Sequence, residues 1–101
     1  MPKQDRSSRN KSPVSRWFVY IVRCGDGSLY TGITTDVSRR CKQHNAGTAS
    51  RYTRSRRPVK LVYQEVSRNQ SSALKREVAI KAMNRSEKLS MIRLSMKSMK
   101  A

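Results

Sequence analysis

The 101-residue chain is poor in cysteine, in acidic residues and in long apolar runs. Its two cysteines, Cys24 and Cys41, are too few for a disulfide framework, and a single histidine argues against a zinc cluster. No apolar stretch reaches membrane-spanning length, and no apolar segment follows the basic N-terminus as it would in a secretory signal. We therefore expect a cytoplasmic protein with two free thiols, no zinc and no membrane-spanning segment.

Acidic side chains are so few that charge is the strongest signal in the composition. Six Asp and Glu stand against 23 Lys and Arg, which gives a formal net charge of +17 at pH 7. A solvated surface does not need so one-sided a balance, so the expected partner is an extended polyanion such as nucleic acid. The less favoured explanations are a device for solubility and attraction to a membrane surface.

The chain is long enough for one domain. Residues 1–15 are mainly polar and basic and show no apolar periodicity, so they are expected to be a disordered basic arm that aids binding without joining the fold. Residues 16–101 can build one modest core. Such a core leaves little room for an internal cavity, so an active site should lie on an open face.

Three strands are expected. Aromatic and β-branched residues run from 17 to 23 and again from 59 to 66, which is typical of strands. Between them, residues 28–33 follow the turn sequence Gly25-Asp26-Gly27 and should return antiparallel to the first strand. A basic loop over residues 48–57 precedes the third strand.

Three helices are also expected. The first follows the capping residues Thr34, Thr35 and Asp36, runs to about Asn45 and is closed by Gly47. Ser71 or Ser72 should cap a second helix that ends near Met83, and Ser86 should cap the last. The positions expected to face the core are Val37, Cys41, Ala73, Leu74, Ile80, Met83, Leu89, Ile92 and Met96. The order β-β-α-β-α-α predicts an α+β fold, a small three-stranded sheet with helices packed on it.

The predicted hairpin carries two tyrosines and an unusual glycine. Antiparallel pairing can bring Tyr20 and Tyr30 together on one face of the sheet, although half-buried structural tyrosines would look the same. Gly32 lies inside a strand, where glycine is costly, and so indicates a bulge, a close approach of another group, or only a packing accommodation.

Two helical positions carry chemistry. Arg40 and His44 lie four residues apart and share one face, where they could meet a phosphate or remain a solvent-facing pair. Glu77 lies near the apolar stripe of the second predicted helix. It could pair with Lys81, or it could be the carboxylate that brings a hard cation to a phosphate.

The run F-V-Y-I-V-R-C-G-D-G-S-L-Y-T-G-I-T-T-D-V-S-R-R-C-K-Q-H resembles the signature of the GIY-YIG nuclease family. The stretches R-Y-T-R-S-R-R-P-V-K-L-V-Y and S-A-L-K-R-E-V-A-I-K are similar to its small stand-alone bacterial members, the YhbQ type. The resemblance covers Trp17 to Ile92 and implies a three-stranded antiparallel sheet flanked by helices. It also implies hydrolysis of phosphodiesters with one divalent metal ion, Mg²⁺ or Mn²⁺.

By position, the resemblance assigns site roles to Tyr20, to Tyr30 with Gly32, to Arg40 and His44, and to Glu77 as the metal ligand. The first motif reads Phe18-Val19-Tyr20, and Thr31 replaces the isoleucine of the second, which leaves both phenols in place. Tyr52 stands where some members have a second histidine, and Asn84 is the nearest candidate for the family's late asparagine.

The resulting hypothesis is a metal-dependent endonuclease. Glu77 holds the metal ion, Arg40 braces the phosphate, and Tyr20 takes the proton of the attacking water, with His44 as a relay. The metal and Arg40 are expected to lower the pKa of the phenol. The basic loop should grip flanking phosphates while Tyr52 stacks on a base, unless the loop is only a solvated turn; its contact residues would be Arg51, Tyr52, Arg54, Arg56 and Arg57.

Two other classes of protein fit the charge. One is a module of the same fold that binds nucleic acid without cutting it, and the other is a structural protein of the nucleoid or ribosome. The enzyme is favoured because a binder does not need a lone carboxylate among cations. We expect a monomer that acts on DNA in preference to RNA.

Overall fold

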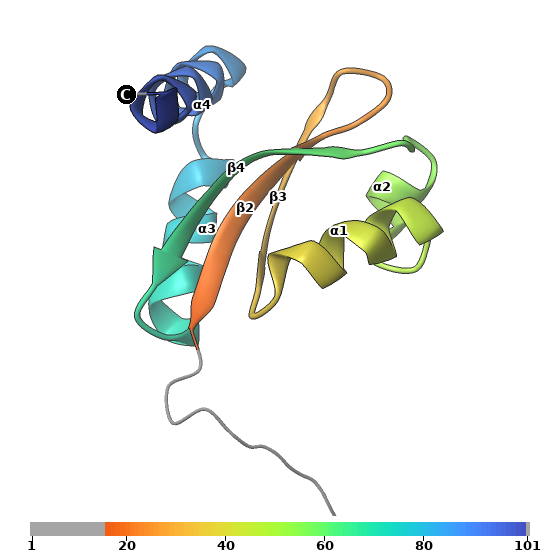
Figure 1. Ribbon diagram of the computed structural model, residues 1–101, viewed down its shortest axis with the longest axis horizontal. Helices are drawn as coiled ribbons and strands as arrows, with labels where there is room; N and C mark the ends of the chain where they lie inside the picture. Colours follow the sequence, from red (N-terminus) through yellow and green to blue (C-terminus); the bar gives the residue numbers. More distant parts are fainter. Residues whose placement is uncertain (1–15, 101) are drawn as a thin grey trace, which may run out of the picture.

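The computed structural model describes residues 16–100, and the expected arm over residues 1–15 lies outside the described residues. One antiparallel sheet contains β2 (Trp17–Arg23), β3 (Leu29–Thr34) and β4 (Lys60–Ser67) in the order β3-β2-β4. The helices are α1 (Val37–Ala46), α2 (Arg51–Arg54), α3 (Gln70–Lys81) and α4 (Arg85–Lys100). The predicted α+β architecture, a three-stranded antiparallel sheet flanked by helices, is confirmed (Figure 1).

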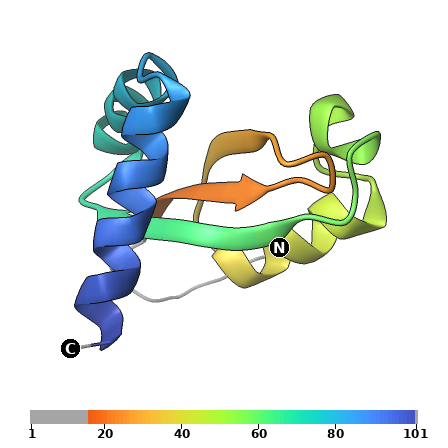
Figure 2. The same cartoon turned by 90° about the horizontal axis from the view of Figure 1, so that it is seen from above.

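Strand β2 is central, and its alternating side chains enter two separate cores. Val19 and Ile21 belong to the first core, whose members from α3 and α4 are Ala73, Ile80 and Ile92. Tyr20 and Val22 belong to the second, with Cys24, Val37 and Val59. The sheet therefore separates α1 from α3, and Figure 2 shows α3 and α4 at the end of the molecule away from α1 and α2.

The hairpin fixes which residues face each other. Tyr20 pairs with Gly32 and Val22 with Tyr30 across the antiparallel ladder, so the two tyrosines lie on the same face. The return strand begins at Leu29, one residue later than predicted, because Ser28 bonds to the Asp26 carboxylate through both its N–H and its hydroxyl.

Helix α1 begins and ends where its capping residues predict. Asp36 accepts a hydrogen bond from the N–H of Arg39, and Gly47 closes the helix in the left-handed conformation at φ +85°. Of the cysteines, Cys24 is buried and Cys41 half-buried, and both are free thiols as expected.

The caps of the other helices differ from prediction. The basic loop contains the short helix α2, which begins after Ser50 because the Ser50 hydroxyl accepts from the N–H of Thr53. Helix α3 is capped by Asn69, two or three residues before the serines that were expected. Helix α4 begins at Arg85 because Asn84 and Glu87 exchange hydrogen bonds in a capping box.

Two predicted core positions are exposed. Leu74 is 44% exposed, because α3 turns the neighbouring Ala73 and the later Ile80 toward the sheet. Met96 of α4 is 53% exposed, while Ile92 is buried. Within residues 16–100, no helix combines the length and hydropathy needed to cross a lipid bilayer.

Candidate active site

Four side chains from four elements meet on the α1 face of the sheet. They are Tyr20 of β2, Tyr30 of β3, His44 of α1 and Thr53 of α2. The phenol oxygen of Tyr20 lies 2.8 Å from Nε2 of His44, and Nδ1 of the same ring lies 2.7 Å from Oγ1 of Thr53. Tyr30 meets the His44 ring edge to face, with centroids 5.3 Å apart. Three of the candidates from the sequence are thus brought together, and Thr53 joins them.

Gly32 is explained by the position of the Tyr20 phenol. A Cβ atom at residue 32 would lie 2.6 Å from the Tyr20 hydroxyl oxygen and 2.8 Å from the ring carbon that carries it. The absence of a side chain on β3 lets the phenol of β2 lie against the neighbouring backbone. A close approach expected at this glycine is thus made by a group of the protein itself, the Tyr20 phenol.

Changing Gly32 to Ala is expected to destabilise the fold by about 1–3 kcal/mol, because the fully buried phenol has no room to yield. Urea unfolding followed by circular dichroism measures the loss. The matched control is Thr31→Val on the same strand: the buried Thr31 hydroxyl has no hydrogen-bond partner within the described residues, so this change should be nearly neutral. Equal stability of the Gly32→Ala variant and the wild type would contradict the predicted clash between a Cβ at residue 32 and the Tyr20 phenol.

Burial keeps the Tyr20 phenol protonated. Loss of solvent raises its pKa well above the ordinary value of 10, and the nearby Tyr30 acts in the same direction. The charge of Arg40 and its hydrogen bond favour phenolate, but they do not offset the burial. Arg40 thus lowers the pKa of Tyr20 as expected, but the expected net lowering is wrong for the protein without metal, because Tyr20 is only 1% exposed and burial has the larger effect.

His44 is held in its neutral form. Burial lowers its pKa below the ordinary value of 6.5, and the positive charge of Arg40 lowers it further. A neutral ring has one nitrogen that accepts and one that donates. The Tyr20 hydroxyl is buried and has only Nε2 of His44 as a hydrogen-bond acceptor among the described residues, so Nε2 is the accepting nitrogen.

Acidification is expected to destabilise the protein through His44. Because its pKa is lower in the folded protein, the unfolded chain binds the proton first as the pH falls below about 6.5, and stability falls with it. The other groups that face the ring are the phenols of Tyr20 and Tyr30 and the guanidinium of Arg40, and burial keeps the Tyr20 phenol protonated. Urea unfolding between about pH 7 and pH 5 should show a slope of up to about 1.4 kcal/mol per pH unit. A His44→Gln protein with the same slope would contradict the assignment.

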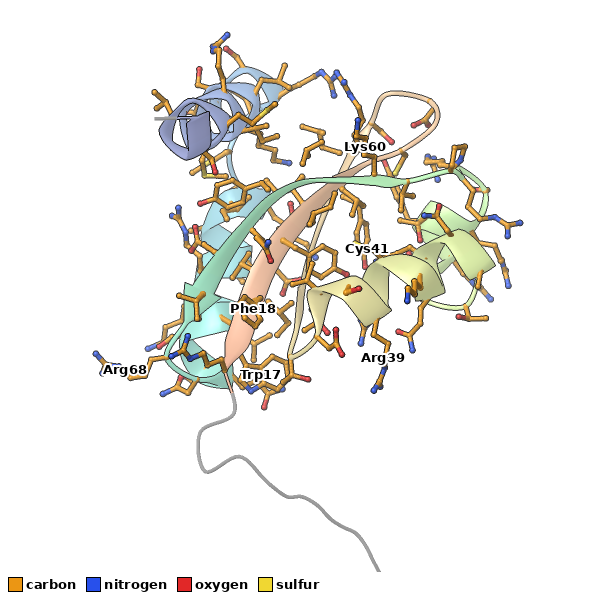
Figure 3. The ribbon with its side chains drawn as sticks, viewed as in Figure 1. Trp17, Phe18, Arg39, Cys41, Lys60 and Arg68 are labelled. Carbon is orange, nitrogen blue, oxygen red and sulfur yellow. The ribbon has the colours of Figure 1, made fainter. Side chains whose placement is uncertain are left out.

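Arg40 lies beside this cluster on α1. Its Nε atom donates to Oε1 of Gln43 at 2.9 Å, and its charge reaches both Tyr20 and His44. Figure 3 shows Arg39 pointing away from the sheet, in line with the helical spacing that separates it from Arg40 and His44. A half-buried guanidinium beside a hydrogen-bonded phenol is suited to contact an oxyanion.

Glu77 is placed apart from the tyrosines. It lies on α3, which packs on the other face of the sheet, and its carboxylate meets Lys81 at 3.3 Å. Within the described residues, no hydrogen bond or ion pair joins Glu77 to Tyr20, His44 or Arg40. The structural alternative from the sequence, an ion pair between Glu77 and Lys81, is therefore present.

The donor set suits only a metal ion that needs few protein ligands. No group of three or more His, Cys, Asp and Glu gathers among residues 16–100. Magnesium is commonly bound by one or two carboxylates together with water and substrate phosphates, so a single glutamate fits it. Glu77 is 17% exposed and its partner Lys81 is 53% exposed, so the ion pair contributes only about 0.3–0.5 kcal/mol to stability.

The basic loop is engaged with the protein itself. Tyr52 stacks on Tyr30 at 5.7 Å between centroids, and the Arg56 guanidinium lies 3.9 Å from the Tyr52 centroid. Arg56 also pairs with Asp26 at 3.0 Å, and Arg57 donates to the carbonyl of Arg54 at 3.0 Å. The ring expected to stack on a base thus already has partners within the protein, Tyr30 of β3 and Arg56 of the loop. Arg51 and Arg54 are exposed on the same segment.

Thr53 and Ser50 were missed by the sequence reasoning. Serine is a favoured N-cap residue, so Ser50 was a signal in the sequence that a helix could begin in the basic loop. Nothing local indicates that Thr53 is buried, because arginines flank its segment and its burial depends on His44, nine residues away.

Two tyrosines on one face of a three-stranded antiparallel sheet, beside a helix with Arg and His four residues apart, define a GIY-YIG domain. Residues 16–90 match the family model described as the GIY-YIG catalytic domain, and the chain belongs to this family. The family and the fold expected from the sequence resemblance are confirmed.

Within the family, the chain is similar to the UPF0213 proteins. It is 54% identical over 86 residues to one from Desulfotalea psychrophila, covering 84% of this chain and 78% of that one. A UPF0213 protein of Staphylococcus aureus is 55% identical over 76 residues, covering 75% and 93%.

Two solution NMR structures share the fold. A UPF0213 protein from Bacillus halodurans gives a TM-score of 0.52 at 40% identity, covering 78% of this chain and 84% of that one. A protein from E. faecalis gives 0.54 at 32% identity, covering 86% and 91%.

Proposed function

We propose that the protein is a metal-dependent endonuclease that hydrolyses phosphodiester bonds of nucleic acid, DNA in preference to RNA. The observation that carries the proposal is the buried hydrogen bond of 2.8 Å between the Tyr20 phenol and Nε2 of His44, with Arg40 beside it. This arrangement provides a proton acceptor next to a fixed cation. The net charge of +17 supports a polyanionic substrate.

The proton of the attacking water passes through Tyr20 to His44. Because the resting phenol is protonated, its oxygen accepts the water proton as its own proton moves to Nε2 of the neutral imidazole. No free phenolate is needed, and His44 is the final acceptor. The hydrogen-bond distance is within the range required for such a transfer.

Arg40 binds the scissile phosphate. Its planar guanidinium can donate two parallel hydrogen bonds to a phosphate, and those bonds strengthen as negative charge accumulates on the oxygens. The existing bond from Nε to Gln43 holds the side chain in place beside Tyr20.

Glu77 would hold the metal ion, Mg²⁺ or Mn²⁺. When bound there, such an ion would supply Lewis-acid stabilisation of the negative charge on the phosphate and on the 3′ oxygen that leaves. Helix α3 packs against β3, the edge strand that carries Tyr30, which supports a role for Glu77 on the same substrate. Displacing Lys81 from the weak ion pair would make the carboxylate available.

A binding module without turnover is the second candidate. The ion pair of Glu77 with Lys81 favours it, since a protein that only binds would keep that contact. The enzyme is preferred because a buried chain of Tyr20, His44 and Thr53 is a costly way to fill a core unless its protons are used.

The proposal is tested by a cleavage screen. Purified protein is incubated with end-labelled single strands, duplexes, flaps and junctions of DNA and RNA, with Mg²⁺, Mn²⁺ or EDTA. We expect products that carry 5′-phosphate and 3′-hydroxyl ends, only where metal is present and more readily from DNA. Binding of these substrates with no cutting under any metal would support the binding module instead.

A further inference from the structure

Thr53 has a hydroxyl that is fully buried and fully engaged. Its residue exposure is 0%, and its Oγ1 lies 2.7 Å from Nδ1 of His44 and 2.9 Å from Oγ of Ser50. The backbone N–H of Thr53 donates to the same Ser50 hydroxyl at 3.1 Å. The cap of α2 therefore also fixes the oxygen that faces the histidine.

The positions of the protons follow from the neighbouring acceptors. The single proton of the Thr53 hydroxyl can go to Ser50, through either its Oγ atom at 2.9 Å or its carbonyl oxygen at 3.5 Å. A lone pair of Oγ1 then faces Nδ1 of His44. On the other side of the ring, Nε2 must accept from Tyr20, so the proton of the neutral ring resides on Nδ1 and points at Thr53.

We propose that Thr53 is a positioning residue, which accepts the Nδ1 proton of His44 and thereby keeps the lone pair of Nε2 directed at Tyr20. Without this acceptor the ring could carry its proton on Nε2, and Tyr20 would have no group to receive its own proton. The consequence for cleavage rests on the proposed function. The tautomer itself is a property of the resting protein.

The tautomer of His44 can be measured without overlap from other histidines, because the chain contains one histidine. Nitrogen-15 NMR of the imidazole distinguishes the protonated nitrogen from the bare one. In the wild-type protein above the pKa of His44, we expect Nδ1 to be the protonated nitrogen and Nε2 the bare one. A wild-type spectrum with the proton on Nε2 overturns the proposal, and this result does not depend on any variant folding or on any cleavage.

Three variants separate positioning from packing. Thr53→Val keeps the shape but removes the acceptor, and should shift His44 toward a mixture of tautomers. Thr53→Ser keeps the hydroxyl and should restore the wild-type spectrum. Thr31→Val, which removes a buried hydroxyl without a partner in the described residues, should leave the spectrum unchanged. A folded Thr53→Val protein with the wild-type spectrum would overturn the proposal.

Cleavage supplies the second readout. Thr53→Val should lower kcat by about 10- to 100-fold with little change in KM, as for other residues that orient a catalytic histidine, and Thr53→Ser should recover most of it. Loss of kcat in Thr53→Ser equal to that in Thr53→Val would show that the hydroxyl is not what matters. If the wild type cuts nothing, the proposed function fails, while the NMR spectrum still decides the role of Thr53.

Discussion

Replacing Tyr20 by Phe is expected to reduce phosphodiester cleavage by about 10²- to 10⁴-fold. The variant removes one oxygen atom, and with it the group that receives the water proton and passes its own to His44. The fold should survive with a loss of about 1–3 kcal/mol, because Nε2 of His44 is left buried without a donor. Single-turnover rates at saturating protein measure the chemical step apart from binding.

The control for this change is Tyr63→Phe. Tyr63 packs in the other core, where its hydroxyl bonds to Glu65, so the same atom is removed on the face of the sheet away from Tyr20 and His44. Its rate should match that of the wild type. A Tyr20→Phe protein that is folded and cuts at the wild-type rate would remove the Tyr20–His44 pair from the mechanism.

Replacing Glu77 by Gln is expected to lower metal-dependent cleavage by orders of magnitude. The change keeps the size of the side chain but removes the charge that would hold the metal ion, together with the several kcal/mol of transition-state stabilisation that such an ion supplies. Binding of nucleic acid in EDTA should be unchanged or tighter, because the protein gains one unit of positive charge. Nicking rates and dissociation constants for the folded variant measure both effects.

Two controls separate the metal from the ion pair. Lys81→Ala removes the partner and leaves the carboxylate, so it should cut at least as well as the wild type and lose at most about 0.5 kcal/mol of stability. Glu65→Gln makes the same change of charge on β4, where the carboxylate pairs with Arg76, and should keep its cleavage. If Glu77→Gln and Lys81→Ala both nick at the wild-type rate, the ion pair between Glu77 and Lys81 has only a structural role.

The hairpin and its tyrosines could be predicted because the information is local. A run of aromatic and β-branched residues from Trp17 to Arg23, ended by a glycine-rich turn, sets both the strand and its antiparallel return. Pairing then determines that Tyr20 and Tyr30 share a face. The two ends of α1 could be predicted for the same reason, since Asp36 and Gly47 are adjacent to the helix that they cap.

The protonation of the site could not be predicted, because it depends on burial. The sequence correctly placed Arg40 near the phenol, and its charge does favour phenolate, but the larger effect is the loss of solvent around Tyr20. That loss arises from α1 and β3 closing over the ring. For the same reason Thr53 could not be recognised as part of the site before the contact of α2 with His44 was known.

Which residues of α3 face the sheet could not be predicted either. The spacing of Ala73, Leu74 and Ile80 permits more than one orientation of the helix, and Ala73 packs at 0% exposure while Leu74 is left outside. Glu77 then lies on the side of the sheet opposite Tyr20. The metal-binding role that we propose for Glu77 therefore requires a substrate that contacts both Glu77 and the Tyr20 site.

The most direct test of the account is the rate of strand cleavage by the wild-type protein as Mg²⁺ is titrated against EDTA, with nucleic acid fully bound throughout. We expect no cleavage in EDTA, a rate that rises with Mg²⁺ to saturation, and recovery with Mn²⁺. Bound nucleic acid that stays intact at every metal concentration would contradict it and leave a module that binds without cutting.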